Sequence, residues 1–421
     1  MSDGFDIIQT GKSAKAASFV LQSLSRREKD LALRAVADAL VENSDAIIKE
    51  NARDLEAAKA AGTSQAMLDR LLLDKKRIDD MALSIRQVCD LNDPIGEVLE
   101  EFTRPNGLRI EKVRVPMGVI GIIYESRPNV TSDAFSLCFK TGNAVILRGG
   151  SDAISSNKAI VSVIRDALES VNITKDAVLL VTDTSREVAR QMMQCNRYID
   201  LLIPRGGAGL IRSVVENSTI PVIETGTGNC HIFVDETADV DMAVNIIYNA
   251  KTQRMGVCNA AESLLVHEKI APVAVPAICK SLRSKDIEIR SDTRSLSLVP
   301  EFASDMKTAT EEDFATEFLG PVISLAIVSS VDEAIDHVNR YTTHHSDAII
   351  TNDPGNAEKF LNCVDSACVY VNASTRFTDG FEFGFGAEIG ISTQKLHARG
   401  PMGLRELTSY KYKVYGNGQI R

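Results

Sequence analysis

Residues 119–124 read VIGIIY, and this uninterrupted apolar run indicates the fold class more directly than any other part of the sequence. Short apolar runs also occur at residues 144–147, 178–181 and 199–203, separated by amphipathic segments. Short buried strands that alternate with helices are typical of a doubly wound α/β fold, in which helices cover both faces of a parallel sheet. A similar alternation resumes at residues 232–234, 264–266, 322–328, 348–350 and 368–371. The sequence therefore predicts two α/β domains.

Two other regions flank this pattern. Residues 13–91 are rich in Ala, Leu, Lys, Arg and Glu with apolar residues at helical spacing, which predicts a helical opening region. Within it, Ser25 and Glu28 fit a capping box at the start of a helix. Residues 108–115 alternate apolar with charged side chains after a turn at Asn106 and Gly107, and we expect an oligomerisation hairpin there.

The composition favours small-molecule chemistry. A chain of 421 residues with 44% hydrophobic and 25% charged residues has material for more than one packed core. Since the sequence shows neither a signal-type start nor an apolar run of spanning length, we expect no secretion and no membrane insertion. Eight scattered cysteines suit a reducing compartment, so we expect a cytoplasmic protein. A net charge of −10 disfavours nucleic acid and anionic lipid as partners.

Cys258 lies in residues 253–260, QRMGVCNA, between a predicted helix that ends near Lys251 and the predicted strand at 264–266. A thiol in such a loop can be reached by a substrate and can act as a nucleophile. An isolated cysteine is more often a small buried hydrophobic residue, so the thiol needs support from its context. Upstream, residues 224–229 read ETGTGN, a glycine-rich turn that begins with the carboxylate Glu224 and follows a short predicted strand at 222–223.

The order of three motifs resembles the active-site signature of the aldehyde dehydrogenase superfamily. They are the turn at Glu224, the glycine-preceded Cys258, and residues 317–322, EFLGPV. Within that superfamily, residues 124–131 (YESRPNVT) and 369–377 (VYVNASTRF) resemble the gamma-glutamyl phosphate reductases. The likeness continues through residues 384–390 and 397–401 and covers roughly residues 116–404.

The resemblance implies an aldehyde dehydrogenase-like α/β fold with three parts. We expect a Rossmann-type NADP-binding domain at residues 1–92 and 118–230 and an α/β catalytic domain at 231–402. A small β oligomerisation arm is expected at 93–117 and 403–421. The arm implies a homo-oligomer, and both a dimer and a tetramer are compatible with the sequence.

The resemblance also implies the reaction, the NADPH-dependent reduction of L-glutamyl 5-phosphate to L-glutamate 5-semialdehyde and phosphate in proline biosynthesis. The resemblance implies that Cys258 carries the acyl group as a thioester. The superfamily's Trp-Asn pair is absent, so Asn129 or Arg127 must replace it in the oxyanion hole, and we expect Asn129 to do so together with the Cys258 backbone amide. The substrate-binding residues implied are Arg127, Asn372, Ser374, Thr375 and Arg376. The substrate either arrives free or is handed over by the glutamate 5-kinase that makes it.

The cofactor is expected to be NADP(H). Residues 205–210, RGGAGL, open a predicted helix whose first N–H groups and dipole favour a pyrophosphate. Arg148 ends a predicted strand and is expected to meet the adenosine 2′-phosphate, whereas the resemblance assigns the nicotinamide ribose to Glu317. The full cofactor set is Arg148, Gly149, Gly150, Arg205, Gly206, Gly207, Glu224, Gly226 and Glu317.

Two other functions fit parts of the sequence. In a hydrolytic aldehyde dehydrogenase Glu224 would activate water, whereas in the reductase it would order the turn or face the cofactor. A non-catalytic dinucleotide-binding or scaffolding protein would show every motif except the thiol. The histidines have no ligand spacing, and we expect no metal; they include His231, His267, His337 and His344.

Overall fold

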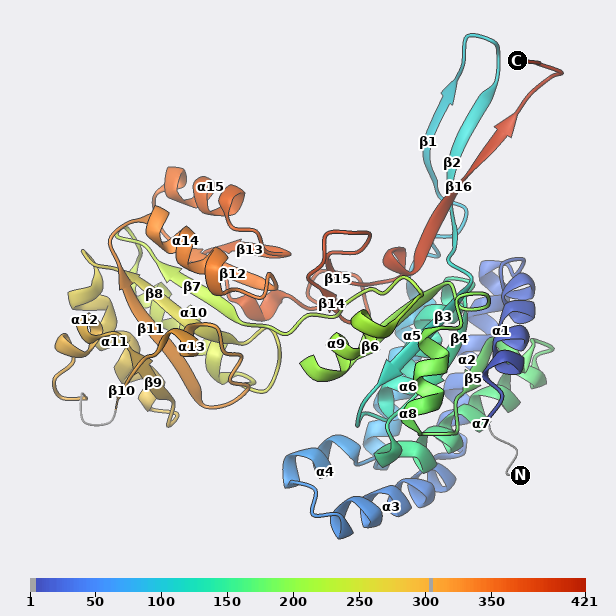
Figure 1. The fold of residues 1–421 in the computed structure, drawn as a ribbon, viewed down its shortest axis with the longest axis horizontal. Helices are drawn as coiled ribbons and strands as arrows, with labels where there is room; N and C mark the ends of the chain where they lie inside the picture. Colours follow the sequence, from blue (N-terminus) through green and yellow to red (C-terminus); the bar gives the residue numbers. More distant parts are fainter. Residues whose placement is uncertain (1–4, 303–305) are drawn as a thin grey trace. The chain divides into compact units, whose positions relative to one another are not determined.

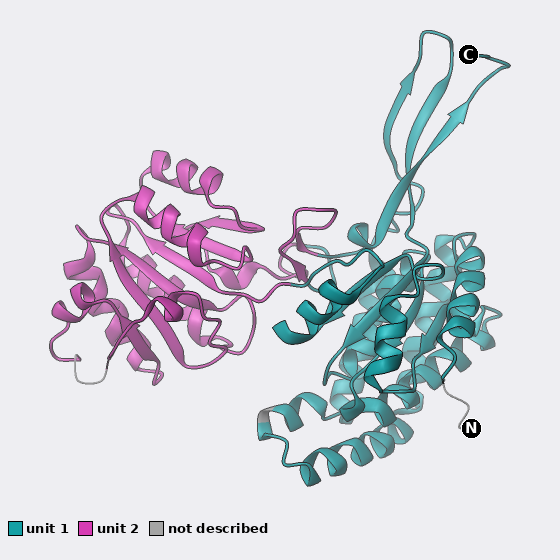
Figure 2. Cartoon of the chain, viewed as in Figure 1, with its two compact units in different colours: residues 1–225, 384–390, 402–421 teal, residues 226–383, 391–401 magenta. Residues whose placement is uncertain are grey.

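The structure is a computed structural model that describes residues 5–302 and 306–421. The chain divides into two compact units (Figure 2). Unit 1 comprises Met1–Thr225, Gly384–Gly390 and Met402–Arg421, and unit 2 comprises Gly226–Phe383 and Ile391–Pro401. Each unit has its own parallel sheet, as expected for an α/β protein.

The core of unit 1 is a four-stranded parallel sheet in the order β5-β4-β3-β6. The strands are β3 Val119–Tyr124, β4 Ala144–Arg148, β5 Val178–Leu180 and β6 Leu201–Arg205. Every residue of β3 is buried, which explains its uninterrupted apolar sequence. The chain passes from β3 to β4 and β5 on one side and then returns to β6 on the other. In such sheets, ligands bind outside the carboxyl ends of the strands at this switch point.

Helices surround that sheet (Figure 1). The opening region forms helices as predicted, and the Ser25–Glu28 capping box is present, with the Glu28 carboxylate accepting the Ser25 N–H at 2.7 Å. The helices are α1 Ile7–Leu21, α2 Arg26–Glu42, α3 Ser44–Ala60, α4 Gln65–Leu71, α5 Lys75–Asp90, α6 Asn129–Lys140, α7 Ile154–Ser170, α8 Arg186–Met193 and α9 Ala208–Asn217. Three 3₁₀ turns, η1 Ser151–Ala153, η2 Lys175–Ala177 and η4 Arg405–Leu407, complete unit 1.

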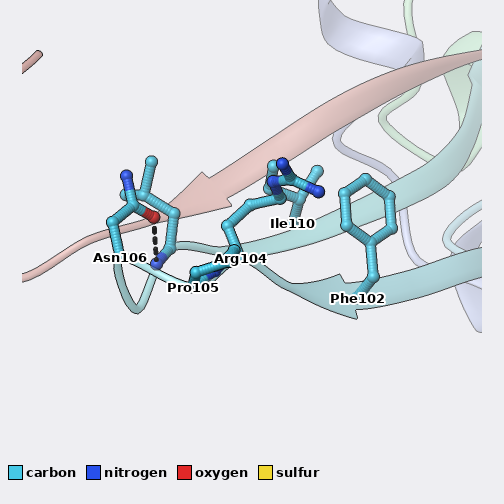
Figure 3. A pocket seen from close by; sticks show the side chains of 6 residues that line it. Phe102, Arg104, Pro105, Asn106 and Ile110 are labelled. Atoms are coloured by element: carbon cyan, nitrogen blue, oxygen red, sulfur yellow. Dashed lines mark hydrogen bonds between the residues drawn. The ribbon is translucent and has the colours of Figure 1, made fainter.

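An antiparallel arm projects from unit 1 (Figure 1). It has the strand order β1-β2-β16, with β1 Val98–Thr103, β2 Arg109–Pro116 and β16 Thr408–Tyr415. The predicted hairpin is confirmed, and Gly107 at its turn has a φ of 86°, which favours glycine. A hollow of about 590 Å³ at the tip (Figure 3) is lined by Phe102, Arg104, Pro105, Asn106, Leu108 and Ile110. The oligomerising role of this arm stays a prediction.

Unit 2 contains a seven-stranded parallel sheet in the order β10-β9-β11-β8-β7-β12-β13. Its strands are β7 Cys230–Val234, β8 Ala261–His267, β9 Glu288–Ser291, β10 Lys307–Thr308, β11 Val322–Val328, β12 Ser346–Ile350 and β13 Cys368–Val371. The helices are α10 Val240–Thr252, α11 Ala271–Arg283, α12 Thr293–Ser297, α13 Glu311–Phe314, α14 Val331–Tyr341 and α15 Pro354–Cys363, with the 3₁₀ turn η3 Thr375–Phe377. A small antiparallel pair joins β14 Ile391–Ser392 to β15 Gly400–Pro401.

Some boundaries differ from the sequence predictions. The strand predicted at 199–203 is β6, which runs on to Arg205 because Arg205 pairs with Tyr124 of β3. The strand predicted at 222–223 is only an isolated bridge between Val222 and Leu202. Strand β9 was not predicted, because its charged residues do not give an apolar pattern. In the structure these charges are paired, with Arg290 Nε 2.8 Å from Glu288 Oε1.

Three parts of the chain belong to a different unit from the one expected. Residues 226–230 were assigned with 118–230 but lie in unit 2, and Met402 was assigned with 231–402 but lies in unit 1. Residues 384–390 were assigned to the domain 231–402, whereas the structure groups them with unit 1. The physical reason is local pairing, because the Ile389 N–H donates to the Met402 carbonyl and the Met402 N–H donates to the Gly390 carbonyl. The functions assigned to the domains stay predictions.

Candidate active site

Cys258 lies in the loop 253–260 between α10 and β8, as the sequence predicted. Its side chain is partly exposed, whereas Cys138, Cys195 and Cys368 are buried. Cys195 follows the end of α8 at Met193 and lies in neither a helix nor a strand. The Cys258 thiol thus combines a loop position with access to solvent.

The glycine-rich turn is in close contact with this loop. A Cβ added to Gly228 would lie 1.4 Å from the Cys258 carbonyl oxygen, so only glycine fits at this position. The Cys230 thiol donates to the same carbonyl with 3.2 Å between sulfur and oxygen. A Cβ on Gly226 would lie 2.2 Å from the Thr393 side chain. Gly228 therefore permits the close approach of the thiol-loop backbone, and Gly226 leaves room for the Thr393 side chain.

The segment 374–378 holds the thiol loop through another set of hydrogen bonds. The Thr375 hydroxyl donates to the Asn259 carbonyl at 2.8 Å, and the Asn259 side-chain amide donates to the Thr378 carbonyl at 2.9 Å. Arg376 Nε donates to Gln253 Oε1 at 3.0 Å. Burial and the neighbouring Arg254 lower the pKa of the Arg376 guanidinium, and Asp379, followed by smaller effects of the cysteines, opposes this shift. The segment 374–378 is thus hydrogen-bonded to Gln253 and Asn259, near the two ends of the thiol loop.

Two predicted substrate-binding residues form hydrogen bonds within the chain. The Asn372 side chain pairs with the Thr351 backbone, accepting its N–H and donating to its carbonyl at 2.9 Å each. Ser374 accepts the Arg376 N–H at 3.3 Å and so caps the η3 turn. Both side chains shape the segment that carries Arg376, and their contact with substrate stays a prediction.

Glu317 holds the glycine turn. Its Oε1 accepts the Gly228 N–H at 2.7 Å. Burial raises the pKa of the Glu317 carboxyl, and the hydrogen bond from Gly228 opposes this shift. In unit 2 the structure therefore brings the EFLGPV motif, the glycine turn and the thiol loop together.

The sequence interpretation missed a buried ion pair beside this loop. Lys251 Nζ lies 2.5 Å from Glu262 Oε2, and both side chains are 0% exposed. Burial raises the pKa of Glu262 and lowers that of Lys251, while the attraction between them opposes both shifts. Glu262 Oε1 also accepts the Leu319 N–H at 3.2 Å. The available signal was a pair of opposite charges flanking the motif within otherwise apolar segments.

In unit 1, Asn129 begins α6, and its side-chain amide donates to Asp133 Oδ2 at 3.1 Å. Burial raises the pKa of Asp133 to about 6, although hydrogen bonds from Asn129 and Ser84 oppose this. Arg127 is exposed in the turn between β3 and α6. These three residues, Arg127, Asn129 and Asp133, follow the carboxyl end of a central strand, where ligands are expected.

The predicted dinucleotide loop lies at the carboxyl end of β6. Gly207 is the N-cap of α9, and its N–H donates to Glu125 Oε2 at 2.9 Å. A Cβ on Gly206 would lie 2.4 Å from the same oxygen. Arg205 is the last residue of β6, and Glu224 lies further along, where the neighbouring Thr225 hydroxyl donates to the Pro204 carbonyl at 2.7 Å. The start of α9 thus already binds an anionic oxygen of the chain.

Arg148 ends β4, as predicted, but part of its guanidinium is engaged. Its Nη2 donates to the Thr184 carbonyl at 2.7 Å. Burial lowers the pKa of Arg148, and Asp183 and then Glu125 oppose the shift. A Cβ on Gly149 would lie 2.2 Å from the Asn157 amide nitrogen, and one on Gly150 would lie 2.3 Å from Asp152 Oδ1. Both glycines therefore occupy close contacts.

Among residues 5–302 and 306–421, no cluster of three or more His, Cys, Asp or Glu is arranged to hold a metal ion. Within the same ranges, no helix is both long and apolar enough to cross a membrane.

Comparisons with known proteins agree with the fold and with these motifs. The model of the aldehyde dehydrogenase family matches residues 2–295 and 297–412. The gamma-glutamyl phosphate reductase of Clostridium botulinum (strain Alaska E43 / Type E3) is 60% identical over 416 residues, covering 99% of this chain and 100% of the relative. That of Heliobacterium modesticaldum is 60% identical over 411 residues and 98% of both chains.

A solved structure gives the same result. The crystal structure of gamma-glutamyl phosphate reductase from Thermotoga maritima has a TM-score of 0.96 and 50% identity. The match covers 99% of this chain and 100% of the other. The chain therefore belongs to the aldehyde dehydrogenase family and, within it, to the group of the gamma-glutamyl phosphate reductases.

Proposed function

We propose that the chain reduces L-glutamyl 5-phosphate to L-glutamate 5-semialdehyde and phosphate, a step of proline biosynthesis, through a thioester on Cys258. The observation that carries the proposal is the partly exposed Cys258 thiol on a loop held by Gly228 on one side and Thr375 on the other. Relatives that are 60% identical over nearly the whole chain are named gamma-glutamyl phosphate reductase, which supports the substrate.

In the first step the Cys258 thiolate attacks the acyl carbon of the substrate. The bond from this carbon to the phosphate oxygen breaks, and inorganic phosphate leaves with the bonding electrons. Negative charge develops on the carbonyl oxygen, and we propose the Cys258 backbone N–H as a donor to it. The partner donor proposed from the sequence is Asn129. Its side chain is held by Asp133, which would fix the direction of the amide.

In the second step the thioester carbon is reduced. When bound, NADPH supplies a hydride to this carbon. The resulting oxyanion then re-forms the carbonyl, the carbon–sulfur bond breaks, and Cys258 is released as a thiolate while the aldehyde departs. The chain's task is to hold the thiol still. The contact of Gly228 with the Cys258 carbonyl and the hydrogen bond from the Asn259 side chain to the Thr378 carbonyl support that role.

We propose NADP(H) as the cofactor. Its fit is supported by the first turn of α9, where the Gly207 N–H already binds a carboxylate oxygen, so that an anionic phosphate oxygen matches the same donor. Arg148 is proposed for the adenosine 2′-phosphate with the Gly149 and Gly150 backbone close by. Glu317 is proposed for the nicotinamide ribose, as the resemblance implies.

The remaining proposals concern substrate recognition and partners. Arg127 and Arg376 are proposed to bind the anionic groups of the substrate, because a guanidinium grips carboxylates and phosphates with paired donors. We also propose a homo-oligomer assembled through the arm, and a glutamate 5-kinase as the source of the substrate. We propose a cytoplasmic location, and the lack of a disulfide among the eight cysteines is consistent with it.

The experiment that tests the proposed function traps the thioester. Protein is mixed with L-glutamate 5-semialdehyde and NADP⁺ in phosphate-free buffer, and its intact mass is measured. We expect a glutamyl adduct on Cys258 that phosphate removes and that Cys258→Ser does not form. Absence of the adduct with release of free glutamate would support the hydrolytic enzyme. Absence of both adduct and turnover would support a non-catalytic protein.

A further inference from the structure

The buried pair of Lys251 and Glu262 encloses the thiol loop at both of its ends. Lys251 is in the last turn of α10, where the chain enters the loop, and Glu262 is the second residue of β8, where the chain leaves it. Their side chains meet at 2.5 Å, and neither is exposed. The pair therefore fixes the span that the residues around Cys258 must bridge.

Glu262 also connects this loop to the EFLGPV motif. Its second carboxylate oxygen, Oε1, accepts the Leu319 N–H at 3.2 Å. Leu319 has a φ of 52°, a left-handed conformation that disfavours a residue with a side chain, so an added hydrogen bond helps to hold it. Two residues earlier, Glu317 accepts the Gly228 N–H at 2.7 Å, and Gly228 packs against the Cys258 carbonyl. A continuous chain of contacts thus runs from the pair to the reacting residue.

A buried ion pair contributes little net stability to a fold in general, because its desolvation opposes its attraction. Two charges removed from water lose hydration that their attraction only partly restores, and apolar residues of similar volume often give equal or greater stability. This pair also joins the two ends of the thiol loop to the Leu319 backbone, so the geometry that it imposes explains it better than stability does.

The geometry points to Lys251 and Glu262 as positioning residues that hold the thiol loop and the Leu319 backbone in the arrangement Cys258 needs. This inference rests on the proposed role of Cys258 as the nucleophile. Neither residue touches the reacting atoms in this account. They act through the loop ends and through the Leu319 N–H.

Two double variants separate positioning from stability. Lys251→Met with Glu262→Gln removes both charges but keeps a side-chain oxygen able to accept the Leu319 N–H. Lys251→Met with Glu262→Leu removes the charges and the acceptor. The measurements are the rate of Cys258 alkylation by iodoacetamide across pH, followed by peptide mass spectrometry, together with Tm and kcat. Alkylation does not depend on the substrate, so failure of this inference is distinguishable from failure of the proposed function.

We expect both double variants to fold with a Tm close to that of the wild type. In the Gln variant, the rate of Cys258 alkylation and kcat should stay within about twofold of the wild-type values. In the Leu variant both should differ from wild type by about fivefold or more, which is the factor that corresponds to the loss of one hydrogen bond. If the Leu variant does not fold, Lys251→Leu with Glu262→Met provides a second apolar combination for the same measurement.

The matched control is the buried pair of Lys29 and Asp93 in unit 1, whose side chains are 2% and 9% exposed. Lys29→Met with Asp93→Leu should leave Cys258 alkylation unchanged. Wild-type alkylation and kcat in the folded Leu variant would overturn the inference. An equal change in the Lys29 and Asp93 control would overturn it as well, because the effect would then be one of general stability.

Discussion

Cys258 lies in a loop and is partly exposed, which distinguishes it from the buried cysteines of the chain. Its role can be tested directly by substitution. We predict that Cys258→Ser lowers turnover at least about a thousandfold, because a hydroxyl is a far weaker nucleophile than a thiolate. Binding of NADPH, measured by fluorescence titration, should change little. The buried Cys138 provides a matched control, since Cys138→Ala should cost stability and not activity. A serine variant with near wild-type turnover would remove Cys258 from the mechanism.

Asp133 makes stability depend on pH in a direction that can be derived. Its folded pKa of about 6 lies above the ordinary value of 3.8, so the carboxyl binds a proton more tightly in the folded state. Its contribution to stability is complete below about pH 4 and is lost as the pH rises through 6. The loss is at most about 3 kcal/mol and is reduced by solvent, because the side chain is partly exposed.

Asp133→Asn should therefore flatten the pH dependence of the free energy of unfolding between pH 4 and 7, which urea titrations at several pH values will measure. Near pH 7, the free energy of unfolding of the variant should rise relative to that of the wild type. An unchanged pH dependence would show that burial does not perturb this carboxyl.

At the scale of elements, the contact between the glycine turn and the thiol loop predicts that alanine substitutions at two glycines have different effects on turnover. Gly228→Ala places a Cβ 1.4 Å from the Cys258 carbonyl oxygen, so the loop must move. We expect turnover to fall by about a hundredfold, the cost of a displacement of roughly 1 Å at a reacting group. Gly256→Ala lies in the same loop, but its nearest atom is the Leu319 carbonyl oxygen at 3.8 Å, so activity should stay within about threefold. Equal kinetics for both variants would contradict the close-contact account.

Most elements could be predicted because their residues carry a local signal. Strand β3 is apolar throughout because it is buried throughout, and Ser25 and Glu28 specify their own cap. Strand β9 could not be predicted in the same way, since Glu288 and Arg290 are neutralised by each other and by partners that come from elsewhere in the chain. The pattern of one segment cannot reveal such pairing.

The candidate site shows the same limit. The motifs around Cys258 and Glu317 could be recognised in the sequence. The hydrogen bond between Glu317 and Gly228 could not be predicted, because it depends on the tertiary fold. The pair of Lys251 and Glu262 was missed because charged residues are normally read as exposed. Asn372 was predicted to bind substrate, but its side chain forms hydrogen bonds with the Thr351 backbone. The motif alone could not indicate this contact.

At the scale of the whole molecule, the arm predicts assembly. Tyr410, Tyr412 and Val414 are exposed on one face of β16, at the alternate positions of a strand. We predict that Tyr412→Glu weakens a homo-oligomer, seen as a smaller species in sedimentation velocity, because it introduces charge into an apolar row. Lys411→Glu changes charge at an adjacent position facing the other way and should leave the assembly intact. A wild-type protein that sediments as a monomer would exclude the arm as an oligomerisation element.

The central claim is that the thioester on Cys258 is resolved by phosphate and not by water. The most direct measurement is NADP⁺ reduction by L-glutamate 5-semialdehyde with and without inorganic phosphate or arsenate, with free glutamate assayed in parallel. We predict that reduction requires the anion and that Glu224→Gln keeps substantial phosphate-dependent activity. Release of free glutamate in phosphate-free buffer at a comparable rate, lost in Glu224→Gln, would contradict the account and identify a hydrolytic aldehyde dehydrogenase.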